Sequence, residues 1–239
     1  MAKKKTPRAP FTGVREKEIS FEASKSSGAV SGLLMRPEKA RWLLVFAHGA
    51  GAGMRHPFME SVARLLAEHG VASFRYHFPY MENGSRRPDP RPILLHTVQA
   101  AVRTAAELGE GLPLIAGGKS MGGRMTSMAA AQDPLPGVRG LVFFGFPLHP
   151  PGKPSGERAE HLAHVQIPML FLQGTRDALA DLTLLQPVCD QLGPRATLHI
   201  EEGADHSFRV MKTSGMTTSD KLLRIVRAVS EWADGLSPM

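Results

Sequence analysis

Ser120 lies in a segment whose residue types and spacing favour nucleophilic chemistry. It is the middle residue of Gly118-Lys119-Ser120-Met121-Gly122, a G-x-S-x-G sequence that follows the apolar run 114–116 and precedes a segment with helical spacing. At such a sharp strand-to-helix turn, glycines on both sides let strand and helix pass closely, while the serine adopts a strained conformation. The next amide, that of Met121, lies at a helix N-terminus, where it can stabilise an oxyanion. The spacing therefore predicts a serine nucleophile.

His206 and Asp177 supply the two further groups that a serine nucleophile needs. A serine hydroxyl is a poor nucleophile at neutral pH, so an imidazole must take its proton and a carboxylate must hold that imidazole in the useful tautomer. Asp177 follows the apolar run 169–172, and His206 lies on a loop ahead of the last helical segment. The chain order serine, acid, histidine is that of α/β-hydrolases. We therefore predict a triad of Ser120, Asp177 and His206, with Asp181 as the alternative acid.

The glycine-rich stretch after residue 47 is the candidate for the rest of the oxyanion hole. The apolar run 42–47 ends in His48-Gly49-Ala50-Gly51-Ala52-Gly53. In α/β-hydrolases the loop at this place gives a second backbone amide, and glycines let the backbone approach the substrate. We predict that this amide is the one of Ala50, and we expect His48 to brace the loop. The alternative is a flexible turn that only begins the next helix.

Two aromatic and proline-rich loops are candidates for the substrate pocket. Phe78 and Tyr80 lie in one loop, Phe146 lies in the other, and each loop follows a predicted strand. These side chains fit an apolar acyl or alcohol pocket, although aromatic loop residues also serve as plain packing. Arg124, one helical turn beyond Ser120, fits either an anionic group of the substrate or a structural carboxylate. The sequence leaves both pairs of alternatives open.

Three other motifs compete for a functional role. Gly118-Lys119-Ser120 also matches the end of a phosphate-binding loop, but that motif needs glycine five positions earlier, where the chain has Pro113. His161 and His164 have helical spacing without a third metal ligand, so we expect surface or lid positions for them. Cys189, in a predicted helix without a glycine elbow, is interpreted as a packed thiol. We expect neither a metal nor a cofactor.

Short apolar runs bounded by glycine or proline predict the sheet that positions these residues. Runs without alternation fit strands buried on both faces of a parallel sheet, and the helical segments between them imply crossovers on both faces. We predict an α/β-hydrolase fold, a three-layer sandwich with a mostly parallel central sheet and helices on both faces. The buried strands are 42–47, 71–74, 114–116, 138–144 and 169–172, the antiparallel edge is 18–24 and 29–35, and the helices are 58–69, 93–108, 121–131 and 221–232.

Composition and charge fit a single domain, 16–239, behind a basic tail, 1–15. With 239 residues, of which 42% are hydrophobic, the chain can bury a large core. Four positive charges of the tail leave about +3 of the formal +7 for the rest, so we expect no specific nucleic-acid partner. No apolar run approaches the roughly 20 residues of a membrane span. The single cysteine fits a reducing compartment. We predict a cytoplasmic protein without a membrane partner, and the oligomeric state is not indicated.

Three longer segments carry a resemblance to a known family. They are Gly118-Lys119-Ser120-Met121-Gly122-Gly123-Arg124, Phe78-Pro79-Tyr80-Met81 and Gly145-Phe146-Pro147-Leu148-His149-Pro150-Pro151-Gly152-Lys153-Pro154. Together they resemble the dienelactone-hydrolase-like group of predicted α/β-hydrolases that includes the testis-expressed and NSL-complex-subunit-like proteins, roughly from Trp42 to the C-terminus. The resemblance implies the same fold and triad. Dienelactone hydrolase itself has cysteine where this chain has Ser120, so lactone cleavage is not carried over.

Two functions follow from these patterns. The first is a serine hydrolase that cleaves a small-molecule ester or thioester through an acyl-enzyme intermediate. The second is a binding or scaffold module that keeps the hydrolase fold without turnover, because some members of the resembling group serve as complex subunits.

Overall fold

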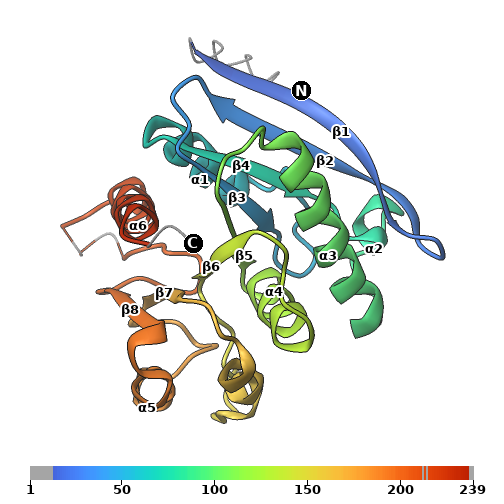
Figure 1. Cartoon of the computed structure of the whole chain (residues 1–239). Helices are drawn as coiled ribbons and strands as arrows, with labels where there is room; N and C mark the ends of the chain where they lie inside the picture. Colours follow the sequence, from blue (N-terminus) through green and yellow to red (C-terminus); the bar gives the residue numbers. More distant parts are fainter. Residues whose placement is uncertain (1–12, 212, 214, 237–239) are drawn as a thin grey trace, which may run out of the picture.

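One eight-stranded sheet organises the structure, a computed structural model that describes residues 13–211, 213 and 215–236 (Figure 1). The strand order is β1-β2-β4-β3-β5-β6-β7-β8. β2 pairs antiparallel with β1 and β4, whereas every other pair is parallel, which confirms the predicted mostly parallel sheet. The strands are β1 (Val14–Ser24), β2 (Gly28–Pro37), β3 (Trp42–Ala47), β4 (Val71–Tyr76), β5 (Leu114–Lys119), β6 (Val138–Phe144), β7 (Met169–Gly174) and β8 (Ala196–Glu201).

Helices cover both faces of the sheet and enclose two hydrophobic cores (Figure 1). On one face, α1 and α6 pack through Val62 and Ile225 against apolar strand residues such as Phe46. On the other face, α3, α4 and α5 cover the opposite side chains of the same strands. The helices are α1 (Pro57–Glu68), α2 (Pro79–Glu82), α3 (Arg91–Leu108), α4 (Met121–Gln132), α5 (Leu182–Leu192) and α6 (Thr218–Asp234), with the 3₁₀ helices η1 (Glu157–His164) and η2 (Gly193–Arg195).

The predicted strands and the four long helices are confirmed to within a few residues. The structure adds α2 and η1, which the sequence left in loops, because such short or 3₁₀ elements give too few turns for a periodic signal. Residues 1–12 of the predicted tail lie outside the described residues. Strand β1 begins at Val14, inside the stretch 1–15 that we assigned to the tail.

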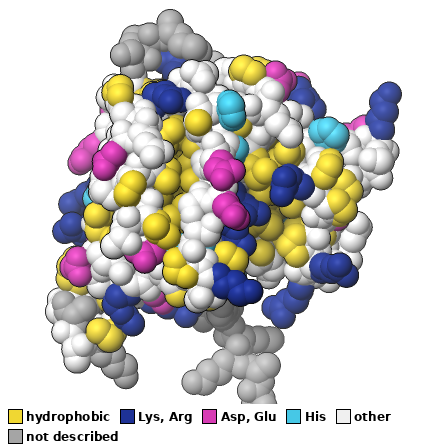
Figure 2. Space-filling model, turned by 90° about the horizontal axis from the view of Figure 1, so that it is seen from below, with side chains coloured by type: hydrophobic (Ala, Val, Ile, Leu, Met, Phe, Trp, Pro, Cys, Tyr) yellow, Lys and Arg dark blue, Asp and Glu magenta, His cyan; other side chains and the backbone are white. Residues whose placement is uncertain are grey.

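The described surface mixes charges of both signs with hydrophobic side chains. On the face drawn in Figure 2, Lys and Arg side chains are interspersed with Asp and Glu and lie beside hydrophobic patches. Among the described residues, no helix combines the length and the hydropathy needed to cross a bilayer.

Candidate active site

Ser120 forms the turn from β5 into α4. Strand β5 ends at Lys119 and α4 begins at Met121, so Ser120 is the N-cap residue, with φ 52° and ψ −119°. A positive φ is uncommon for a residue with a side chain, and it marks strain that the surroundings must hold in place. The Ser120 amide donates to Phe144 O at 3.2 Å, and its carbonyl accepts from Arg124 N at 3.2 Å. The predicted strand, turn and helix around the serine are therefore confirmed.

Close backbone contacts require the glycines on either side of Ser120. A Cβ at Gly118 would lie 2.4 Å from Ala47 O, and one at Gly122 would lie 2.6 Å from both Ala47 O and His48 O. These distances are well below van der Waals contact, so a larger residue would push β5 or α4 away from β3. The G-x-S-x-G spacing thus has a steric origin in this fold.

His206 and Asp177 meet, as predicted, on the loops after β8 and β7. Nδ1 of His206 donates to Oδ2 of Asp177 at 2.7 Å. The Asp177 carboxylate is buried and accepts two more hydrogen bonds, from Gln173 Nε2 at 2.5 Å and from Leu179 N at 2.8 Å. Because an ionised carboxylate only accepts, the proton in this bond lies on Nδ1, and Nε2 carries the lone pair when the ring is neutral. This is the tautomer that a general base requires.

The alternative acid, Asp181, has a different role. Its Oδ1 accepts from Thr183 N at 2.9 Å and from Thr183 Oγ1 at 2.7 Å, which makes Asp181 the N-cap of α5. Its amide donates to His149 Nε2 at 2.9 Å. Of the two candidate acids, Asp177 is the one that contacts His206.

Nε2 of His206 is buried, and no group among the described residues bonds to it, the Ser120 hydroxyl included. Two contacts nevertheless link His206 to the residues around the Ser120 turn. Lys119 Nζ, from the residue before Ser120, donates to His206 O at 2.6 Å, and a Cβ at Gly145 would lie 3.2 Å from His206 Nδ1. Catalytic hydrogen bonds are often long in free enzymes and tighten with substrate, so this geometry is compatible with a serine-histidine pair.

Lys119 is a site residue that the sequence suggested only for a phosphate-binding loop. Its side chain is buried, and its ammonium lies 5.7 Å from the ring centroid of Phe58. Burial lowers the pKa of Lys119 to about 7, although the nearby carboxylates of Asp177 and Asp205 act in the opposite direction. Its bond to His206 O means that Lys119 holds the histidine loop.

The glycine-rich loop after β3 lies against Ser120. A Cβ at Gly49 would lie 3.6 Å from Ser120 Cβ. His48 braces this loop, as expected, because its Nδ1 donates to Gly49 O at 2.8 Å and its Nε2 accepts from Phe78 N at 3.2 Å. Burial lowers the pKa of His48 to about 4, so the ring is neutral at physiological pH and keeps both bonds.

The two amides predicted for the oxyanion hole lie on either side of this contact. Met121 is the first residue of α4, and amides of a first helical turn have no acceptor within their own helix. Ala50 is exposed, and its amide has no acceptor among the described residues, whereas the amides of Gly51 and Ala52 bond to Tyr80 Oη and Gly49 O. Both predicted N–H groups are thus available, and their oxyanion role stays a prediction.

The three aromatic residues predicted to line the pocket are almost completely covered by protein atoms. Phe78, Tyr80 and Phe146 expose at most 3% of their surface. Phe78 stacks on Tyr80 with ring centroids 6.3 Å apart, and Phe146 packs edge-on against Phe143 at 5.3 Å. Packing is the role that these contacts establish, while contact with a substrate stays a prediction. Arg124 is half-buried, and its Nε is buried with no hydrogen-bond partner in the described part of the chain.

Two residues that hold the acid or its loop were not found from the sequence. Gln173 donates to Asp177 and also accepts from Phe146 N at 3.0 Å through its Oε1. His149, in the proline-rich segment, accepts from Asp181 N, so that this segment is tied to the acid loop. Gln173 directly follows the predicted strand 169–172, and His149 lies in the segment 145–154 that carries the family resemblance, but neither residue had a role assigned to it from the sequence.

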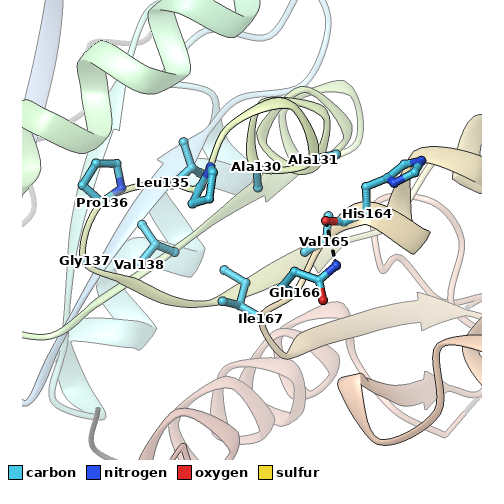
Figure 3. A pocket seen from close by; sticks show the side chains of 11 residues that line it. Ala130, Ala131, Leu135, Pro136, Gly137, Val138, His164, Val165, Gln166 and Ile167 are labelled. Carbon is cyan, nitrogen blue, oxygen red and sulfur yellow. Dashed lines mark hydrogen bonds between the residues drawn. The ribbon is translucent and has the colours of Figure 1, made fainter.

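The remaining candidates lie outside this constellation. In the part of the chain that the structure describes, no group of three or more His, Cys, Asp or Glu side chains is arranged to hold a metal ion. Cys189 is buried in α5, and burial raises the pKa of its thiol to about 11, which fits the packed thiol that we predicted. A mostly apolar pocket of about 330 Å³ lies at the amino ends of β6 and β7, lined by residues such as Leu135 and Ile167 (Figure 3). Ser120 is at the carboxyl end of β5, the opposite edge of the sheet.

The chain belongs to the alpha/beta hydrolase domain family, which matches residues 40–234. Among solved structures it is similar to a dienelactone hydrolase from Anabaena variabilis, with 22% identity, 95% of this chain and 100% of that chain covered, and a TM-score of 0.73. It is also similar to a cold-adapted esterase from an Arctic intertidal metagenomic library, with 19% identity, 93% and 96% covered, and a TM-score of 0.66. At these identities the likeness shows a shared fold.

A curated relative carries a different name. A Mycobacterium tuberculosis protein named as a putative phosphoribosyl transferase is 29% identical over 200 residues, which are 82% of this chain and 42% of that protein. The chain therefore spans less than half the length of this relative.

Proposed function

We propose that this α/β-hydrolase cleaves a small ester or thioester with Ser120 as nucleophile. The observation that carries the proposal is the bond from His206 Nδ1 to the buried Asp177, which leaves a lone pair on a buried, unpartnered Nε2. Ser120 Oγ attacks the carbonyl carbon while Nε2 takes its proton. The bond to the alcohol or thiol then breaks, and Nε2 returns the proton to the leaving group. Water, deprotonated in the same way, releases the acid and restores Ser120.

Charge that develops on the substrate oxygen is bound by backbone amides in this proposal. The N–H groups of Met121 and Ala50 flank Ser120, and neither donates a hydrogen bond to another group among the described residues. Preorganised donors of this kind often contribute the largest share of a rate enhancement. Asp177 acts through His206 and is a positioning residue, as are Gln173 and Lys119.

Ser120→Ala tests the nucleophile. We expect kcat for p-nitrophenyl esters to fall by about 10³-fold or more, because removal of a triad member typically has that effect. A fluorophosphonate probe is expected to label the wild-type protein and not Ser120→Ala. Wild-type rates in a clean Ser120→Ala preparation would exclude Ser120 as the nucleophile. Esters of increasing chain length would then define the size of the acyl pocket.

One observation favours a second candidate, a binding module without turnover. The Ser120 hydroxyl does not bond to His206 Nε2 in the described residues, so the pair is not assembled in the free protein. Complete inertness of the wild-type protein to fluorophosphonates and to every ester tested would support this module. For the hydrolase, we also propose that it acts in the cytoplasm, that its partner is a small-molecule substrate, and that it is related to the NSL-complex-subunit-like group.

A further inference from the structure

Three arginines lie on three elements that pack together: α4, which begins directly after Ser120, α3 and η1. Arg124 lies one turn beyond Ser120, and because residues four apart share a helix face, its side chain leaves α4 on the side of Ser120. Arg91 is the first residue of α3, and Arg158 lies in η1. Both α3 and η1 pack against α4. The fold thus places one arginine on each of three elements that pack together.

These arginines act on one another electrostatically. Burial lowers the pKa of Arg124, and the positive charges of Arg158 and Arg91 lower it further. Burial also lowers the pKa of His161 to about 4, and the charges of Arg124 and Arg91 add to that effect. His161 is therefore neutral at physiological pH and adds no charge of its own. The result is a cluster of like charges, which destabilises the free protein.

None of these three arginines forms an ion pair with a carboxylate of the described residues. Four other arginines do: Arg36 with Glu110, Arg41 with Asp234, Arg55 with Glu18 and Arg224 with Glu201. Arg124 Nε is buried and has no hydrogen-bond partner among the described residues, a property that it shares with Arg75 Nε. The structural carboxylate that the sequence allowed for Arg124 is therefore not found in the described chain. A buried donor that lacks an acceptor is unfavourable unless another molecule supplies one.

Short contacts join the cluster to the candidate active site. Ser127 Oγ donates to Arg124 O at 3.0 Å and lies 2.7 Å from His161 Nε2 in a second hydrogen bond, which fixes η1 on α4. The His161 ring lies 6.5 Å from that of Phe146. Phe146 directly follows Gly145, the residue that leaves room for His206. These contacts therefore connect α4 and η1, the elements that carry Arg124 and Arg158, to the loop beside His206.

We propose that Arg124, Arg91 and Arg158 bind an anionic group of the substrate, a carboxylate or a phosphate, beside the ester bond that Ser120 attacks. Guanidinium groups match the geometry of both oxyanions and bind them through paired hydrogen bonds. A bound anion supplies the acceptor that Arg124 lacks and offsets the repulsion among the three charges. The inference rests on the proposed hydrolase function and narrows it, because the preferred substrate is then a negatively charged ester.

A pair of matched esters tests this preference. The p-nitrophenyl monoester of adipic acid carries a terminal carboxylate, and p-nitrophenyl hexanoate has the same chain length without it. We expect Arg124→Gln to lower kcat/KM for the adipate ester by about 10- to 100-fold, the range of a hydrogen bond to a charged group, and to change hexanoate by less than about threefold. Arg103→Gln is the control, since Arg103 is exposed on the same helix as Arg91, about 18 Å along its axis. Equal losses for both esters in Arg124→Gln would overturn the proposal.

Anion binding separates this proposal from the hydrolase function itself. Calorimetric titrations of the full chain with adipate and with inorganic phosphate are expected to show binding to wild type and Arg103→Gln, and weaker binding to Arg124→Gln. The tighter of the two anions identifies the group. If wild type binds neither anion, or Arg124→Gln binds as well as wild type, the anion site is refuted whatever the ester activity. Binding without cleavage of any ester would refute the hydrolase function and leave the anion site standing. Arg91→Gln, at an exposed position, and Arg158→Gln give the same comparison should Arg124→Gln not fold.

Discussion

Replacing Asp177 by asparagine tests how the candidate base is held. All three groups that contact the Asp177 carboxylate are donors: His206 Nδ1, Gln173 Nε2 and Leu179 N. Asparagine keeps the shape of the side chain but has one acceptor oxygen and an NH₂ group, which only donates. Whichever way the amide is turned, at least one buried donor then faces another donor.

The size of the effect follows from the two orientations. With the amide oxygen toward Leu179, the NH₂ group faces His206 and favours the tautomer that carries its proton on Nε2, and kcat falls by about 10⁴-fold. With the oxygen toward His206, the tautomer is kept, but a neutral amide replaces the carboxylate and the Leu179 amide is left unpaired. We therefore expect kcat to fall by between about 10² and 10⁴ and the free energy of unfolding to fall by about 1–3 kcal/mol.

Ester hydrolysis and urea unfolding, measured side by side, give both quantities. The matched control is Asp181→Asn, because Asp181 caps α5 and asparagine caps helices equally well. The control is expected to keep wild-type kcat. Wild-type activity in Asp177→Asn, or an equal loss in Asp181→Asn, would refute the assignment of Asp177 as the residue that orients His206.

Two further predictions concern the groups around His206. Gly145→Ala adds a Cβ 3.1 Å from Lys119 Nζ and 3.2 Å from His206 Nδ1, so we expect kcat to fall by about tenfold or more as His206 is displaced. Gly152→Ala, with a similar φ of 69° and no atom near its Cβ, is the control for the backbone strain alone, and equal kcat in the two variants would show that the contact is unimportant. The second prediction concerns pH. Burial lowers the pKa of Lys119 to about 7 from its usual 10.5, so the unfolded chain binds more protons between these values and the Lys119 contribution to stability rises with pH across that window. Lys119→Met is expected to remove that rise, measured by urea unfolding at a series of pH values, and an unchanged pH profile would contradict it.

Much of the fold could be predicted because the central strands are short, continuous runs of apolar residues. The run 42–47 has no polar residue and is buried throughout, as a central parallel strand must be. Helix boundaries were found from the apolar period, which is strong in α6 and in α1. The short α2 and the 3₁₀ helix η1 were missed, since α2 has a single turn and the helical spacing of His161 and His164 in η1 also spans only one turn.

In the candidate site, features set by neighbouring residues could be predicted from the sequence, whereas contacts between distant segments could not. Ser120 was identified because its conformation is dictated by immediate neighbours, the glycines that let the elbow form. The role of Lys119 was not identified, because its partner lies 87 positions away along the chain. A local motif places a side chain at the end of a strand, but it does not say which distant loop will arrive beside it. For Arg124 the sequence left two alternatives, an anionic group of the substrate and a structural carboxylate. Only the surroundings of its guanidinium group in the structure distinguish them.

The bond from Lys119 to the His206 carbonyl has a consequence for engineering. Consecutive residues carry the Ser120 hydroxyl and the group that anchors the His206 loop, so one dipeptide helps to set the distance between the proposed nucleophile and the proposed base. A designer who transplants this centre to another scaffold would need to move Lys119 together with Ser120 and to supply an apolar cover for the lysine stem. Grafts of the three triad side chains alone are expected to leave the histidine loop unanchored.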